Sequence, residues 1–262
     1  KSVNVIRMNC AELKIKSCIV KSGGKIIKSS PKTNEKKEEL EIKLGEKIRG
    51  SCTVHLEFEG ILNDRLLGFY RSKYQQNGKT KYLATTQFEA ADARRAFPCW
   101  DEPEAKATYD ISIIAENKFT AISNMPIKTK KKTGNKTTYH FQKTPLVSTY
   151  LIYLGVGEFE YLTGRAGKIQ IRVVTTKGNT SKGKFSLELG KKLLTSYEKY
   201  FGIKFPLPKL DLIAVPDFAA GAMENWGAIT FRETILLYDP KTSSTRTKQF
   251  IAEVISHEIA HM

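Results

Sequence analysis

The spacing of hydrophobic residues changes once along the chain, near Thr176, and this change limits the possible folds more than any other feature. Before it, apolar and polar residues alternate, as in the run where His55 separates Val54 from Leu56. A period of two residues predicts strands with one buried face. We therefore expect a strand over residues 52–59, with the side chain of His55 on its exposed face.

The same alternation recurs through the first two thirds of the chain. It involves Leu13, Ile15 and Ile19, then Tyr109, Ile111 and Ile113, then Ile169, Ile171 and Val173. Turn sequences separate these runs, namely Ser22-Gly23-Gly24, Asn77-Gly78 and Gly134-Asn135. Asn-Gly between strand-like flanks is a strong hairpin signal. The pattern predicts an N-terminal all-β, sandwich-like domain.

Beyond Thr176 the apolar residues follow a helical period. They are Phe185, Leu189, Leu193, Tyr197 and Phe201. This spacing predicts an amphipathic helix over residues 181–201, ended by Gly202. Strands are expected at 209–215 and 227–232, and a last helix after Ser243-Ser244. We therefore expect an α+β protein of two domains, residues 1–174 and 175–262.

The composition is that of an ordinary soluble protein. Of 262 residues, 40% are hydrophobic and 27% charged, which excludes collagen-like, coiled-coil and wholly disordered chains. No apolar run approaches the ~20 residues that span a bilayer, so no membrane segment is expected. The first residues, Lys1-Ser2-Val3, show neither a signal peptide nor an initiating Met, and we expect a fragment.

The net charge of +16 raises the question of a nucleic-acid partner. The densest basic stretches, residues 128–143 and 177–204, lack interleaved aromatic residues on a common strand, and binding of single strands needs such stacking platforms. We expect loops or a solvated helix face there, and no nucleic-acid partner.

The cysteines form no CxxC pair and are expected to be buried reduced thiols. They are Cys10, Cys18, Cys52 and Cys99. A cytoplasmic location is expected.

The chain ends in a motif with metal-ligand spacing, His257-Glu258-Ile259-Ala260-His261. On a helix, residues four apart lie on one face, so both imidazoles can bind one ion while Glu258 flanks it. Zinc binds histidine nitrogens, and a glutamate beside it can act as general base for attack of water on a peptide carbonyl. This composition produces the motif by chance roughly 0.005 times. A zinc site is therefore favoured over two histidines in an ordinary helix.

A second segment of interest, Gly221-Ala222-Met223-Glu224-Asn225, lies upstream between two predicted strands. Its glycine permits close approach of the backbone to a ligand, and Glu224 is expected to project from a tight turn. Spacing alone leaves two interpretations open, a binding carboxylate or a solvent-facing loop residue.

The two motifs together resemble the M1 family of zinc aminopeptidases, gluzincins related to aminopeptidase N. A third segment agrees, because residues 86–103 are similar to the family signature TQFE followed by ARRAFPC, an aromatic residue and DEP. The resemblance implies an N-terminal β domain followed by a thermolysin-like α/β catalytic domain, of which this chain holds the first part.

The resemblance also implies roles for the residues of the last helix and of the Glu224 turn. His257 and His261 resemble two zinc ligands, and Glu258 resembles the general base. Glu224 resembles the glutamate that binds the free α-amine of the substrate. The segment Gly221–Asn225 resembles the one that binds the substrate and holds its backbone as an added strand.

Two further residues match the family in the first signature. Glu89 resembles a second anionic contact to the substrate amine, and Gln87 resembles a residue lining the first side-chain pocket. Because residues i and i+2 of a strand share a face, Gln87 and Glu89 are expected to point into one cleft.

Two family features have no match before the chain stops at Met262. They are a third zinc ligand, a glutamate downstream of the second histidine, and a later tyrosine that stabilises the oxyanion. The whole protein is expected to use one zinc ion and to release N-terminal residues from peptides with a free amine. This chain alone is expected to bind zinc weakly and to be almost inactive. Oligomeric state and side-chain preference are not predicted.

Two other functions remain open at this point. One is a zinc endopeptidase, which would also cleave peptides with a blocked N-terminus. The other is a noncatalytic module that binds peptide or, through its charge, nucleic acid.

Four charged residues are expected to form an ion-paired structural turn rather than a catalytic group, namely Arg94, Arg95, Asp101 and Glu102. His140 is expected at the surface.

Overall fold

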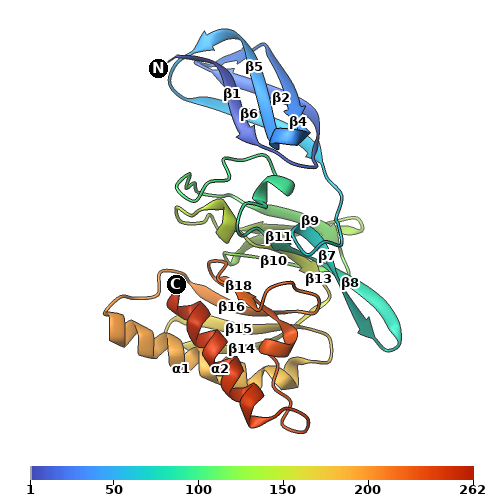
Figure 1. The fold of residues 1–262 in the computed structure, drawn as a ribbon, viewed down its shortest axis with the longest axis vertical. Helices are drawn as coiled ribbons and strands as arrows, with labels where there is room; N and C mark the ends of the chain where they lie inside the picture. Colours follow the sequence, from blue (N-terminus) through green and yellow to red (C-terminus); the bar gives the residue numbers. More distant parts are fainter. Residues whose placement is uncertain (1) are drawn as a thin grey trace.

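The computed structural model describes residues 2–262 and shows three layers stacked along the long axis of the molecule (Figure 1). A small β-sandwich lies at the N-terminal end, and a second set of β-sheets follows it. A mixed sheet covered by two helices lies at the C-terminal end. This order confirms the expected fold class, an all-β part followed by the start of an α/β part.

The N-terminal layer consists of two three-stranded sheets, with strand orders β1-β5-β4 and β3-β2-β6. The strands are β1 (Val3–Asn9), β2 (Lys14–Ser22), β3 (Lys25–Ile27), β4 (Ser29–Asn34), β5 (Glu39–Ile48) and β6 (Cys52–Glu59), with a 3-10 turn η1 (Glu35–Lys37). Ile42 of one sheet and Val20 of the other are fully buried in their common core. His55 is exposed as predicted, whereas Phe58 is also 37% exposed, so the buried face of β6 is shorter than its alternation suggests.

The middle layer contains the sheets β10-β13-β8-β7 and β11-β12-β9. Its strands are β7 (Gly68–Gln76), β8 (Lys79–Gln87), β9 (Ser112–Glu116), β10 (Thr120–Ser123), β11 (Ile127–Thr133), β12 (Lys136–Phe141) and β13 (Leu154–Gly157), with 3-10 turns η2 (Ala93–Arg95) and η3 (Thr149–Leu151). Asn77 and Gly78 both have positive φ in the β7–β8 hairpin, as a two-residue turn of this type requires.

The basic stretch 128–143 is not a loop, which corrects that expectation. Its residues form the antiparallel hairpin β11–β12. Every residue of β11 is exposed, so this edge strand has no apolar alternation by which the sequence could reveal it. Its partner β12 provides the buried side chains, Tyr139 and Phe141. His140 between them is half-exposed.

An ion-pair network joins the sandwich to the middle layer. Arg94 pairs with Asp101 at 3.1 Å and with Glu38 of the sandwich at 3.2 Å. Arg95 also pairs with Glu38, at 2.7 Å. The structural role expected for Arg94, Arg95 and Asp101 is confirmed. Glu102 is exposed and takes part in no ion pair within residues 2–262.

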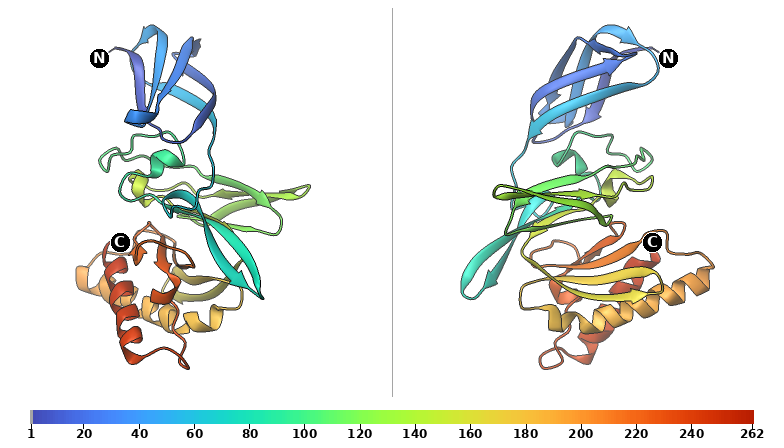
Figure 2. Two further views of the ribbon diagram at one scale, coloured as in Figure 1. Left: turned by 45° about the vertical axis from the view of Figure 1, so that its right-hand side comes forward. Right: turned by 180° about the vertical axis from the view of Figure 1, so that it is seen from behind.

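The C-terminal layer is a five-stranded sheet of order β14-β15-β16-β18-β17. Its elements are β14 (Phe159–Ala166), β15 (Ile169–Thr176), η4 (Thr180–Gly183), α1 (Lys184–Phe201), β16 (Lys209–Val215), β17 (Ala222–Met223), β18 (Ala228–Arg232), η5 (Glu233–Ile235) and α2 (Thr245–Ala260). Strands β15, β16 and β18 are parallel, and β17 runs antiparallel to β18 at one edge. Both helices pack on one face of the sheet (Figure 2).

The pairing of strands in this sheet bears on where the boundary between the two domains lies. A boundary between residues 174 and 175 would divide β15, which pairs with β14 on one side and with β16 on the other. Strand alternation identifies β14 and β15 as strands but does not say which sheet they join. We therefore propose that the boundary lies between β13 and β14.

Both helices occupy the predicted segments, with differences in detail. The buried residues of α1 are Ser186, Leu187, Gly190 and Leu194, rather than the predicted four-residue stripe, of which Phe201 is 55% exposed. A side chain at Gly190 would place its Cβ 3.2 Å from Leu212, so glycine lets the helix approach the sheet closely. The Ser244 hydroxyl accepts a hydrogen bond from the Thr247 amide and begins α2 as predicted.

No helix within residues 2–262 is both long and apolar enough to cross a membrane.

The four cysteines are all unpaired thiols. Cys10 and Cys99 are buried, Cys18 is half-buried and Cys52 is exposed, so the expectation of burial is wrong for Cys52. It stands at the outer end of β6, where the sandwich core does not reach.

A buried lysine joins the C-terminal sheet to the middle layer. The Lys209 ammonium donates three hydrogen bonds of 2.7 Å, to the carbonyls of Ser123 and Gly227 and to the carboxylate of Asp211. Arg172 binds the same carboxylate through two bonds of 2.6 Å. Burial lowers the pKa of Lys209 to about 8, so its ammonium form still predominates at pH 7. This cation is therefore held by acceptors from both layers.

Replacing Lys209 by Met should lower the free energy of unfolding by about 3–5 kcal/mol, because it breaks a buried ion-pair network and removes the ammonium that donates to the Ser123 and Gly227 carbonyls. Urea unfolding followed by circular dichroism measures the change. The matched control is Lys204→Met in the preceding loop, where the exposed lysine pairs with Glu198, and this variant should unfold close to the unsubstituted chain. Equal midpoints for the two variants would contradict the role given to Lys209.

Candidate active site

The last turn of α2 brings two histidines together. Nε2 of His257 lies 3.1 Å from Nε2 of His261, and the ring centroids are 4.7 Å apart. His261 follows the last helical residue but keeps helical φ and ψ, so the one-turn spacing of the motif is preserved. Both side chains are exposed.

The spacing of the two ring nitrogens fits one zinc ion. Nitrogens bound tetrahedrally at about 2.0–2.1 Å from zinc would lie about 3.3 Å apart, close to the observed 3.1 Å. The same distance also allows one ring to donate a hydrogen bond to the other. No group of three metal-ligating side chains occurs within residues 2–262. His257 and His261 thus fit as two ligands of a zinc ion, one fewer than the three protein ligands of a catalytic zinc site.

Glu258 differs from its neighbours because its carboxyl group is buried. It is 5% exposed, and its Oε2 has no hydrogen-bond partner. Burial, followed by the charges of Glu224 and Glu89, raises the pKa of Glu258 to about 7. A carboxyl group with a pKa near neutrality can both take and return a proton, as a general base requires.

Three carboxyl groups from distant parts of the sequence therefore lie near one another, because the charges of Glu224 and Glu89 both act on Glu258. Glu89 follows β8 and Glu224 lies in the β17–β18 hairpin, whereas Glu258 lies on α2. No ion pair within residues 2–262 neutralises any of them. Such a cluster destabilises itself by repulsion, and cations that enter it are bound favourably.

The shared face expected for Gln87 and Glu89 does not exist as a strand face, which corrects that argument. Strand β8 ends at Gln87, and Glu89 lies in the turn beyond it. Gln87 is 8% exposed, and its Oε1 has no hydrogen-bond partner. Glu89 is exposed and still lies near Glu258. The turn, rather than strand alternation, carries Glu89 toward the other carboxylates.

The Gly221–Asn225 segment forms an edge of the sheet. Ala222 and Met223 make up β17, which pairs only with β18. The carbonyl of Gly221 accepts a hydrogen bond from the Arg232 amide at 2.9 Å. Because peptide groups alternate along a strand, the amide and carbonyl of Ala222 face the free edge. This edge could accept a further strand, with Ala222 rather than the Gly221 carbonyl as its partner.

Two residues of this segment have their side chains in the interior. Met223 is 1% exposed and packs in the core that the middle layer and the C-terminal sheet share. Asn225 is fully buried and donates to the Thr230 hydroxyl at 3.1 Å. Their side chains therefore fix the turn, and Glu224 between them is the half-exposed member.

Asn124, which the sequence analysis did not single out, holds this turn against the middle layer. Its amide donates to the carbonyls of Leu151 and Trp226, at 2.8 and 2.9 Å, and its oxygen accepts from the Tyr153 amide at 2.8 Å. It follows β10 directly and is 2% exposed. Only the packing of the two layers identifies it, because nothing in its local sequence distinguishes it from a turn asparagine.

A cavity of about 340 Å³ opens beside Glu224. Its lining includes Lys106, Tyr150, Glu224, Trp226 and His261. Burial, followed by the charges of Glu224 and Glu89, raises the pKa of Tyr150, so this phenol lies near both carboxylates. The cavity thus adjoins the histidine pair and the carboxylate cluster at once. Lys106, Tyr150 and Trp226 are site residues that the sequence alone did not indicate.

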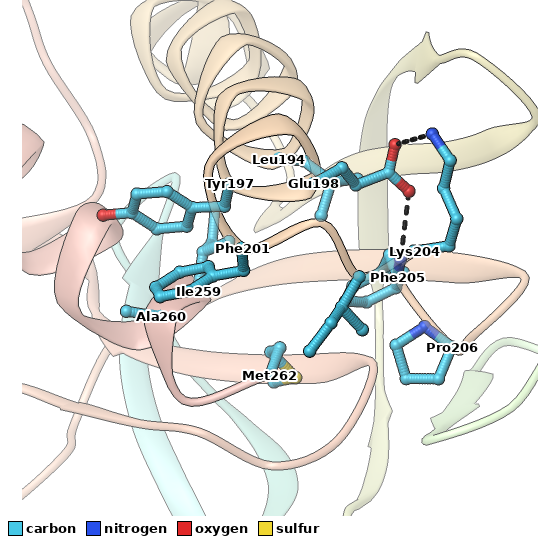
Figure 3. Close-up of a pocket in the computed structure, with 11 residues that line it drawn as sticks. Leu194, Tyr197, Glu198, Phe201, Lys204, Phe205, Pro206, Ile259, Ala260 and Met262 are labelled. Atoms are coloured by element: carbon cyan, nitrogen blue, oxygen red, sulfur yellow. Dashed lines mark hydrogen bonds and ion pairs between the residues drawn. The ribbon is translucent and has the colours of Figure 1, made fainter.

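A second cavity, of about 250 Å³, lies between the ends of α1 and α2 (Figure 3). Its lining is mainly apolar and includes Tyr197, Phe201 and Ile259. The one carboxylate there, Glu198, is bound by Lys204 and by the Phe205 amide. Neither histidine of the pair nor Glu258 lines this cavity. It is therefore separate from the candidate active site.

Comparisons with known proteins find relatives of both parts of the chain. Residues 1–151 match the peptidase M1 N-terminal domain, and residues 185–262 match the peptidase family M1 domain. The chain is 48% identical over 229 residues to aminopeptidase M1 of Arabidopsis thaliana, covering 87% of this chain and 26% of that protein.

Other relatives come from an animal and a fungus. Puromycin-sensitive aminopeptidase of Caenorhabditis elegans is 47% identical over 213 residues, covering 80% of this chain and 22% of that protein. Aminopeptidase 2, mitochondrial, of Saccharomyces cerevisiae is 46% identical over 217 residues, covering 82% of this chain and 23% of that protein. The chain thus spans about a quarter of the length of the curated relatives it matches.

Zinc added to this chain should bind through His257 and His261 and leave the other two histidines, His55 and His140, unaffected. Loss of a group that only hydrogen-bonds to a metal ligand lowers metal affinity 10- to 100-fold. Loss of a ligand itself should cost at least as much, so His261→Ala should weaken zinc binding by about 10-fold or more. Calorimetric titration gives the affinity, and histidine-ring NMR signals identify the site. The matched control is His55→Ala. Zinc-induced shifts at His55 or His140, or unchanged affinity in His261→Ala, would exclude this site.

Proposed function

Because the chain belongs to peptidase family M1, we propose that the whole protein is a zinc-dependent aminopeptidase that removes the N-terminal residue from peptides. The cluster of Glu89, Glu224 and Glu258 beside the histidine pair is the observation that carries this proposal. A metal cation and a substrate ammonium are the two positive charges that such a site can bind together.

Binding of the substrate amine determines which peptide bond the site cleaves. Glu224 lies in a turn fixed by the buried side chains of Met223 and Asn225, so the backbone that carries its carboxylate is held in place before substrate arrives. Glu89 approaches from the middle layer. Two carboxylates around one ammonium anchor the end of the chain by charge-assisted hydrogen bonds. The protein would then release single residues because the reacting bond lies at a set distance from that anchor.

The remaining residues position the peptide and move protons. Ala222 offers its main chain to the substrate backbone as an edge partner, and Gln87 borders the pocket for the first side chain. Glu258 takes a proton from the attacking water and returns it to the leaving amine. A zinc ion held by His257 and His261 would polarise the peptide carbonyl as a Lewis acid.

The two alternative functions predict different results. A zinc endopeptidase would not need Glu224 and Glu89 to meet a free ammonium, and a noncatalytic module would bind peptide without turnover. Binding of nucleic acid through the +16 charge would weaken steeply with salt. We also propose a cytoplasmic location. Imaging of the tagged protein tests it, and the alternative is a mitochondrial location, as in the name of the yeast relative.

Acetylation of the peptide N-terminus should abolish cleavage by the whole protein, because it removes the charge that Glu224 and Glu89 bind. Replacing Glu224 by Gln should lower kcat/KM for free peptides by about 10- to 100-fold, the value of one charge-assisted hydrogen bond. Rates are measured on free and acetylated forms of one peptide side by side.

Glu253→Gln provides the matched control for Glu224→Gln. Glu253 is an exposed carboxylate on α2 without an ion pair within residues 2–262, and its loss should leave kcat/KM unchanged. Equal cleavage of acetylated and free peptides would exclude the aminopeptidase and favour an endopeptidase.

The 262-residue chain by itself should have little or no peptidase activity. It provides two zinc ligands, whereas catalytic zinc sites use three protein ligands. Lack of an oxyanion-stabilising donor alone lowers kcat by about 10²–10³. A fluorogenic aminoacyl substrate, assayed with equal amounts of this chain and of the whole protein, measures the difference. Turnover by the short chain near that of the whole protein would show that this account of the site is wrong.

A further inference from the structure

The cavity beside Glu224 contains one free charge of each sign. Glu224 and Lys106 both line it, and neither forms an ion pair within residues 2–262. The acidic neighbours of Lys106 in sequence, Glu102 and Glu104, are exposed and do not line the cavity. Lys106 is thus a cation that faces the same space as the amine-binding carboxylate.

The backbone that carries Lys106 is attached firmly to the wall of this cavity. Ala107, the next residue, exchanges two backbone hydrogen bonds with Val147, at 3.1 and 2.9 Å. The Ser148 hydroxyl donates to the Pro103 carbonyl at 2.5 Å. Segments 103–107 and 146–151 therefore form one wall. The side chain of Lys106 is itself exposed, but its point of attachment is fixed.

The opposite wall is held at a set position by Asn124. Its side-chain amide bridges the carbonyl of Leu151, on the Lys106 wall, and the carbonyl of Trp226, two residues after Glu224. One buried side chain thus fixes the position of the Glu224 turn relative to the wall that carries Lys106. The aromatic rings of Tyr150 and Trp226 line the space that both charges face.

We propose that this cavity selects short peptides with both termini free, with Lys106 binding the carboxylate while Glu224 binds the ammonium. The inference rests on the proposed function of Glu224. A volume of about 340 Å³ lies at the lower end of the roughly 300–1,000 Å³ of ligand sites, which suits a di- or tripeptide. Opposite charges at both ends recognise a zwitterion, and the aromatic lining accepts its apolar side chains.

The test compares a dipeptide with its C-terminal amide, which lacks only the negative charge. Affinities are measured by calorimetry on the whole, zinc-loaded protein carrying Glu258→Gln, so that binding is read without turnover. The free dipeptide should bind about 3- to 10-fold more tightly than the amide, a modest effect because Lys106 is exposed.

Two lysine substitutions and one control assign this preference. Lys106→Gln should abolish the difference between acid and amide, and Lys106→Arg should restore it because the charge returns. Lys143→Gln, which removes an exposed lysine outside the cavity lining and without an ion pair among the described residues, should leave the difference intact. Retention of amide binding in Lys106→Gln shows that the variant is folded.

Equal affinities for acid and amide in the parent, or a preference that survives Lys106→Gln, would overturn the proposal. Failure of the proposed peptidase activity is a separate result, since it is measured as turnover of the amide by protein with Glu258 intact.

Discussion

The arrangement of the site depends on two buried side chains that hold the C-terminal sheet against the middle layer. Lys209 on β16 donates to the carbonyls of Ser123 and Gly227, and Asn124 donates to the carbonyl of Trp226. Buried carbonyls without donors are costly, so these bonds fix the turn that carries Glu224. Gly227 is needed at the contact because its φ is +70° and a Cβ there would lie 2.7 Å from the Asn124 carbonyl oxygen. These contacts thereby hold the turn that carries Glu224 between two layers, which are built from different parts of the chain.

Much of this fold can be predicted from hydrophobic spacing alone. Strand β16, the start of α2 and the end of α1 lie where the periods and caps indicate. The errors occur where the physical signal is absent or ambiguous. The edge strand β11 buries no side chain, and the strands β14 and β15 alternate normally but join a sheet whose other members come later in sequence. Hydrophobic periodicity indicates which face of a strand is buried, but it does not indicate which strands pair with it.

The candidate site divides in the same way. His257, Glu258 and His261 can be read from local spacing, because one turn of helix brings both imidazoles together. Spacing alone left the role of Glu224 open and Glu89 became a candidate only through family resemblance, and it is the fold that brings both near Glu258. Asn124, Lys106 and Tyr150 carry no local signal, since their importance arises from contacts between segments far apart in sequence. The raised pKa of Glu258 results from its burial and from the nearby charges of Glu224 and Glu89. It is therefore a property of the assembled site, which no local sequence pattern shows.

The central claim is that one cation site for metal and one for the substrate ammonium lie side by side in this carboxylate cluster. A crystal structure of the whole protein with a non-hydrolysable peptide, with zinc located by anomalous scattering, tests it most directly. The account predicts a single zinc peak bound by Nε2 of His257 and of His261, with the peptide ammonium within hydrogen-bond distance of Glu224. A peptide bound with its amine away from Glu224, or zinc bound without either histidine, would contradict it.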